Sequence, residues 1–131
     1  MSEKGKKHDT PAEQVIEIYT ELLNEIWRRV AYLIGGITLQ VLMSNAVRRT
    51  SLAFPFLTQV SVTTCGVSLE KLREVCCSLP KHETRKALQN LVAELFSLLI
   101  SMSGDVIVRE LAPLVKNTEE KLESADEGSA I

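Results

Sequence analysis

The longest regular pattern lies near the start of the chain, where apolar residues recur every three or four positions from Val15 to Ile34. This spacing places them on one face of an α-helix. Thr10 is suited to cap that helix, Pro11 to occupy its first position and Glu13 to close a capping box. We expect the helix to end at Gly35-Gly36, since glycine readily adopts the left-handed conformations that terminate helices.

The rest of the chain predicts further helices separated by short breaks. Pro55 ends the second helix, because the residue before a proline avoids the helical region, and alternating polar and apolar residues after it indicate an extended segment. A lone strand forms no sheet, so this segment runs as an ordered loop or pairs with its copy in another subunit. The predicted elements are helices over about 37–53, 68–79, 81–103 and 105–122, with an extended segment around 57–67.

These elements define an all-α fold, an antiparallel bundle of about five helices of which two are long and three shorter. Residues 10–122 form a single helical domain. Residues 1–9 are expected to be a flexible basic tail and residues 123–131 a disordered acidic tail.

The composition fits one soluble globular domain and argues against nucleic acid as a partner. The chain has 131 residues, of which 45% are hydrophobic, with 15 basic and 17 acidic side chains. This near balance argues against a nucleic-acid binder. Val30 to Val47 carries no charge and approaches membrane-spanning length, but its glycines and polar residues argue against a span.

Cysteine usage and the polar N-terminus favour a reducing, cytoplasmic location. The three cysteines, Cys65, Cys76 and Cys77, are odd in number and match no zinc-binding spacing. Cys76 falls on the apolar face of the predicted third helix, where it serves as a small buried hydrophobe. The N-terminus shows no apolar segment of the kind found in signal peptides.

The sequence offers little that points to catalysis, metal binding or a cofactor. A stripe of glutamates lies on the polar face of the first helix, but no Glu-x-x-His element accompanies it, so we interpret it as a solvated face. Motifs for nucleophilic catalysis and nucleotide binding are missing from the sequence. We therefore expect no enzyme activity, no metal and no cofactor. The glutamates are Glu13, Glu17, Glu21 and Glu25.

One short segment suggests an alternative function in phosphotransfer. His82, Glu83 and Arg85 share the His-Glu-x-Arg order of the phosphorylated helix of sensor histidine kinases, which this segment resembles. An exposed imidazole can accept a phosphoryl group while a neighbouring carboxylate orients the ring. That resemblance implies His82 as phospho-acceptor and Glu83 as its helper, although the segment lacks the proline that usually follows.

Two arginine pairs flank the uncharged region and form a candidate anion-binding patch. Arg28 and Arg29 precede it, and Arg48 and Arg49 follow it. If the two helices pack as a hairpin, the pairs could meet at its open end and bind phosphate or an acidic protein. Glu25 lies four residues before Arg29, so part of this charge is expected to be used in a local pair.

The distribution of charge leads to the main functional hypothesis. Arg48 and Arg49 are the only charged residues from Val30 to Leu69, a stretch in which a small monomer should expose several. We expect a non-catalytic, cytoplasmic interaction or regulatory module that forms a homodimer or docks on a protein partner. A third hypothesis is a sensor in which the first, second and fourth helices enclose an apolar molecule or haem near Trp27, Phe96 and a cysteine. Candidate interface residues are Ile37, Leu39, Phe54, Phe56, Val60 and Val62.

Overall fold

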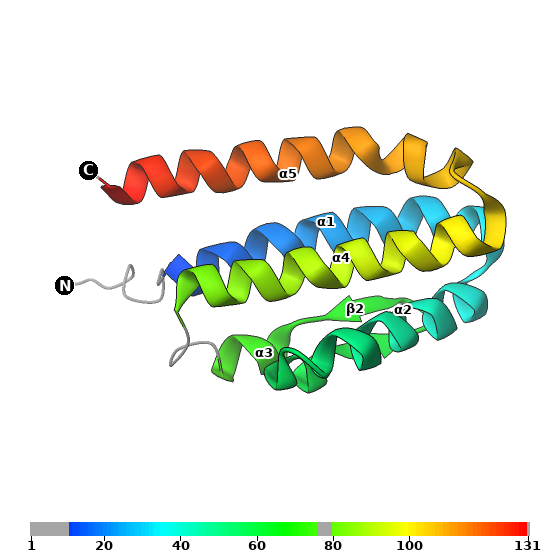
Figure 1. The fold of residues 1–131 in the computed structure, drawn as a ribbon, viewed down its shortest axis with the longest axis horizontal. Coiled ribbons are helices and arrows are strands. Elements are labelled where there is room, and N and C mark those ends of the chain that lie inside the picture. Colours follow the sequence, from blue (N-terminus) through cyan, green and yellow to red (C-terminus); the bar gives the residue numbers. More distant parts are fainter. Residues whose placement is uncertain (1–10, 76–79, 131) are drawn as a thin grey trace.

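A computed structural model describes residues 11–75 and 80–130, without the side chains of residues 11, 12, 103 and 124–130. Its long helices are α1 (Pro11–Ile34), α2 (Gly36–Ser51), α4 (Lys81–Ser103) and α5 (Val106–Ala130). α1 and α4 run in the same direction, while α2 and α5 run back against them (Figure 1). The predicted all-α bundle is confirmed, with five helices and one two-stranded sheet in the described part of the chain.

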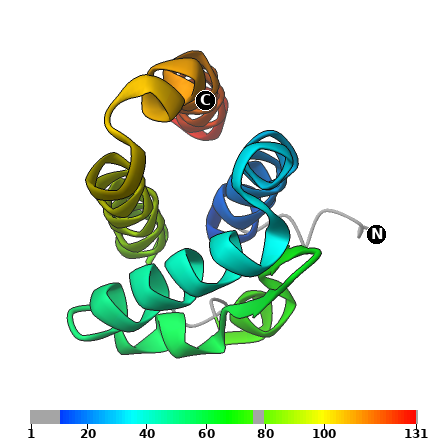
Figure 2. The same ribbon diagram turned by 90° about the vertical axis from the view of Figure 1, so that its right-hand side faces the viewer.

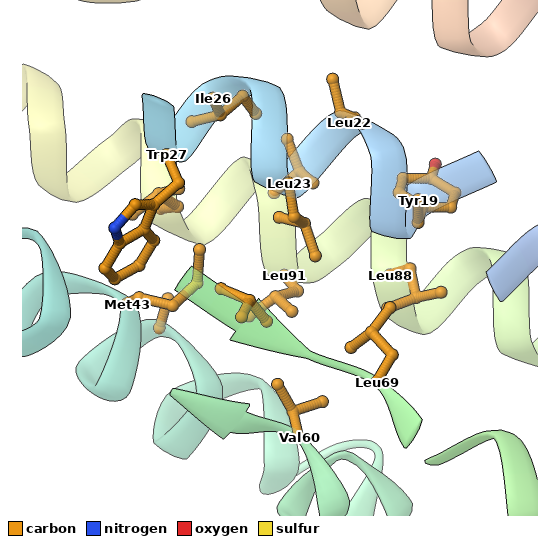
Figure 3. Close-up of a cluster of buried hydrophobic side chains, with 14 of the residues drawn as sticks. Tyr19, Leu22, Leu23, Ile26, Trp27, Met43, Val60, Leu69, Leu88 and Leu91 are labelled. Atoms are coloured by element: carbon orange, nitrogen blue, oxygen red, sulfur yellow. The ribbon is translucent and has the colours of Figure 1, made fainter. Parts of the chain in front are cut away.

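α1 and α4 lie at the centre of the bundle, with α5 on one side and α2 on the other (Figure 2). Their inward faces supply most of the buried side chains. Fully burying a leucine, isoleucine or valine contributes about 1.5–3 kcal/mol, so this layer holds the helices together. Figure 3 shows the middle of the core, which includes Leu23, Ile26, Met43, Leu88 and Leu91.

The corner between α1 and α2 confirms the predicted helix stop. Gly35 has φ +91°, a conformation that a side chain would strain, and it separates the two helices. Gly36 begins α2 beside the loop around Thr64, where an added Cβ would lie 2.7 Å from the Thr64 carbonyl oxygen. Glycine is therefore needed at one position for its backbone angle and at the next for lack of space.

The extended segment differs from both alternatives predicted for it. The 3-10 helix η2 (Pro55–Gln59) comes first, and β1 (Ser61–Thr63) then pairs antiparallel with β2 (Gly66–Ser68), with Val62 opposite Val67. The prediction of a lone strand was wrong, because the chain turns at Thr63–Gly66 and folds back to form a hairpin. The strand thus finds its partner within the same chain.

Two side chains tie this hairpin to the corner of α1 and α2. The Trp27 indole Nε1 donates a hydrogen bond to the Thr64 carbonyl oxygen at 3.3 Å. The Gln40 Nε2 donates to the Val62 carbonyl oxygen at 3.4 Å. Two backbone carbonyl groups, one in the turn and one in β1, are thereby hydrogen-bonded by residues of neighbouring helices.

The remaining helices follow the sequence prediction, except that α5 is longer than predicted. α3 (Glu70–Val75) begins after Ser68, whose Oγ accepts a hydrogen bond from the Glu70 backbone N–H at 3.4 Å. α4 has the predicted bounds. α5 is as long as α1 and continues past the predicted end of the domain, since neither glycine nor proline interrupts it between Pro113 and Gly128. Cys76 and Cys77 lie outside the described residues.

In the part of the chain that the structure describes, every helix is too short or too polar to cross a membrane. Gly35 interrupts the uncharged stretch from Val30 to Val47, which is thus divided between α1 and α2.

Candidate functional site

Several large apolar side chains gather, exposed, at one end of the bundle. At this end α1 ends, α2 begins, α4 ends and α5 begins, and Figure 2 views it directly. The exposed fraction is 90% for Tyr32, 73% for Ile37, 65% for Val106 and 60% for Leu33. We call this end the distal surface and define it by Tyr32, Leu33, Ile37, Ile100, Met102 and Val106.

Helix geometry explains why these side chains point outward. In the last turns of α1, Val30 faces the core and is fully buried, so Tyr32 and Leu33 must point to other sides of the helix. In α2, Leu39 and Met43 occupy the buried face, which leaves Ile37 on the opposite side. These helices are apolar around more of their circumference than the bundle covers.

A hollow between α1 and α5 adjoins the distal surface. Its volume is about 340 Å³, and Tyr32 and Leu33 belong to both features. Apolar side chains from both helices line it, and charged side chains border it. The lining residues are Arg28, Arg29, Val30, Tyr32, Leu33, Ile107, Glu110 and Leu111. We call it the α1/α5 hollow.

Most charges around this region are paired within the chain. Arg28 and Arg29 both bind the Glu25 carboxylate, with 2.9 Å between Arg29 Nε and Glu25 Oε2. The hydrogen bond from Arg29, with the charges of both guanidinium groups, lowers the pKa of Glu25. Arg109 pairs with Asp105 at 3.3 Å. Among the described residues, no ion pair involves Glu110, which is exposed.

The structure separates the six predicted interface residues into accessible and buried ones. Ile37 is exposed, and Phe56 and Val62 are half-buried. Leu39, Phe54 and Val60 pack into the chain's own core, so the interface prediction needs correction at these three positions. The sequence around these three residues carries little charge because their side chains are buried in the core of the same molecule.

The two arginine pairs face different parts of the molecule. Arg28 and Arg29 border the α1/α5 hollow, whereas Arg49 borders a hollow between α2 and α4 and pairs with Glu94 at 3.3 Å. Arg48 donates a hydrogen bond to Asn45 at 2.7 Å. The structure therefore does not bring the pairs together into the predicted anion-binding patch.

The structure adds no contacts that support the predicted phosphotransfer site at His82 or a metal site on the glutamate stripe of α1. His82 is exposed in the first turn of α4, next to Glu83, and phosphotransfer there stays a prediction. Within the glutamate stripe of α1, Glu17 pairs with Arg73 and Glu21 with Lys121. Among residues 11–75 and 80–130, no three potential ligand side chains of histidine, cysteine, aspartate or glutamate converge on a metal position.

The residues suggested for a ligand sensor lie apart. Phe96 lines a hollow of about 340 Å³ between α1, α4 and α5, together with Tyr19, while Trp27 packs toward α2 and donates a hydrogen bond to Thr64. Burial raises the pKa of Tyr19 to about 12, so its hydroxyl stays protonated at neutral pH. Cys65 is exposed in the hairpin turn. Trp27 and Phe96 thus pack toward different neighbouring helices.

The sequence prediction missed five of the six residues of the distal surface. One available signal was the apolar side of α1, which widens after Trp27. Another was the run Leu98-Leu99-Ile100, in which neighbouring residues must face different directions in a helix.

Comparison of the chain with protein-family models, with curated proteins and with solved structures finds no match in any of the three.

Proposed function

We propose that this protein is a non-catalytic, cytoplasmic interaction or regulatory module that binds protein through its distal surface. The observation that carries the proposal is the exposure of six large apolar side chains at one end of the bundle. Large apolar side chains gathered at one exposed end are typical of binding sites, because leaving them in water is unfavourable.

The surrounding charges favour protein over an anionic partner. A surface for nucleic acid or anionic lipid needs basic groups that remain available to phosphates. Here the three guanidinium groups of Arg28, Arg29 and Arg109 are balanced by three carboxylates, those of Glu25, Asp105 and Glu110, so no positive charge is in excess. An apolar centre with a polar rim resembles the anatomy of protein interfaces.

Photo-crosslinking in the cells that make the protein tests this proposal. A photoreactive amino acid at Ile37 lies on the distal surface, whereas one at Leu52 lies beyond the opposite end of α2. Leu52 is a matched control, since it is also a large apolar residue and 85% of it is exposed. We expect one or a few discrete protein adducts from position 37 that position 52 does not give.

Two results would count against an interaction module. The first is the absence of any discrete protein adduct at position 37. The second is an identical set of adducts at positions 37 and 52, since exposure alone would then explain the crosslinks.

A further inference from the structure

The distal surface carries a projecting side chain and a depression next to each other. Tyr32 is almost fully exposed on α1, and the adjoining α1/α5 hollow has apolar walls that include Leu33, Ile107 and Leu111. A hollow of about 340 Å³ is of the size that holds small organic groups, so it has room for a phenol ring.

A projection and a depression on one surface complement each other when two copies meet about a two-fold axis. In such an interface every contact between one residue and a different residue of the other copy occurs twice, once in each direction. We propose that a second copy of this chain covers the distal surface, with Tyr32 of each copy seated in the α1/α5 hollow of the other. This inference rests on the proposed function and names the partner.

The exposed area agrees with a dimer contact. Six large side chains, exposed by 45–90%, present apolar surface on the order of 600 Å². A standard protein interface buries about 800 Å² on each partner. The distal surface with the walls of the hollow therefore approaches what a stable dimer needs.

Charge around the hollow is also self-complementary. On the α1 side, two guanidinium groups share the single carboxylate of Glu25, which leaves a net positive charge. On the α5 side, Glu110 makes no ion pair among the described residues. Two-fold pairing of α1 against the partner's α5 places Arg28 and Glu110 of opposite copies near each other, in both halves of the interface.

Sedimentation velocity of the full chain at micromolar concentrations tests the dimer. We expect the unmodified chain to sediment as a dimer, and Tyr32→Glu to raise the dimer dissociation constant at least about tenfold, since it places a charge in an apolar hollow. Leu52→Glu is the matched control, because it makes the same kind of change at an exposed apolar position away from the distal surface. Its dissociation constant should match that of the unmodified chain.

A charge exchange tests the orientation of the two copies. Arg28→Glu and Glu110→Arg should each weaken the dimer, and the double variant should bind more tightly than either single variant because opposite charges again face each other. Circular dichroism should show unchanged helix content in all variants.

Several results would overturn the dimer. These are a monomer at about 100 μM, a Tyr32→Glu dimer as tight as the unmodified one, or a double variant no tighter than the single variants. Discrete crosslinked adducts at Ile37 of which none has twice the mass of the chain would likewise overturn it, while leaving the interaction function intact.

Discussion

Replacing Leu91 with alanine is expected to lower the free energy of unfolding by about 3–4 kcal/mol. Leu91 is fully buried and points from α4 into the space between α1, α2 and the hairpin (Figure 3). Removing its side chain leaves a cavity that neighbours from three directions border, so local collapse can fill little of it. Chemical denaturation followed by circular dichroism measures the change.

Ile100→Ala is the matched control, since it also shortens a branched aliphatic side chain of α4. Ile100 belongs to the distal surface and is 45% exposed. At concentrations low enough to keep the chain monomeric, its truncation should cost less than about 1 kcal/mol. Equal losses for Leu91→Ala and Ile100→Ala would contradict the described division between core and distal surface.

Replacing Trp27 with alanine should cost about 3–5 kcal/mol, the range for a buried aromatic residue. Trp27 is 5% exposed, packs from α1 toward α2 and bonds to the hairpin through the Thr64 carbonyl oxygen. It therefore joins three elements. Because the chain has one tryptophan, unfolding must be followed by circular dichroism and not by intrinsic tryptophan fluorescence.

Trp27→Phe separates the two contributions. It keeps much of the apolar contact but removes the indole N–H, so we expect a loss of about 1–2 kcal/mol. If Trp27→Phe destabilised the protein as much as Trp27→Ala, ring packing would not be the main contribution, and the interpretation of Trp27 as a core residue would be wrong.

The helices could be predicted because their signals are local. Periodicity from Val15 to Ile34 marks α1, Gly35 ends it, and the segment 81–103 has the bounds of α4. Each signal depends on a few neighbouring residues, which one sequence displays directly. The turn at Thr63–Gly66 also depends on neighbouring residues. It indicates a hairpin if the segments before and after it are both considered as strands.

The distal surface could not be predicted in the same way, because periodicity shows which faces are apolar but not which faces have a neighbour. Phe54 and Tyr32 are both aromatic residues in weakly charged stretches, yet one is buried and the other is exposed. The difference depends on packing between distant segments. The ion pair of Arg49 with Glu94 likewise joins residues 45 positions apart, which local spacing does not reveal.

The contrast between the buried core and the exposed distal surface is the basis of the proposed function. The same helices that fill the core with one face carry unmatched apolar residues at one end. A bundle stabilised by its own core has no internal need for Tyr32 or Ile37. The proposed contact with protein gives a physical reason for their presence, and the proposed dimer names the partner.

The most direct test measures the exposure of Tyr32 itself. The chain has two tyrosines, Tyr19 in the core and Tyr32 on the distal surface, so fluorotyrosine labelling gives one probe and one internal reference. We predict that a soluble paramagnetic agent relaxes the fluorine signal of Tyr32 at low concentration, and that this effect disappears as the chain dimerises, while Tyr19 stays protected throughout. A Tyr32 signal that remains open to solvent at every concentration, and in extract of the cells that make the protein, would contradict a protein-binding distal surface.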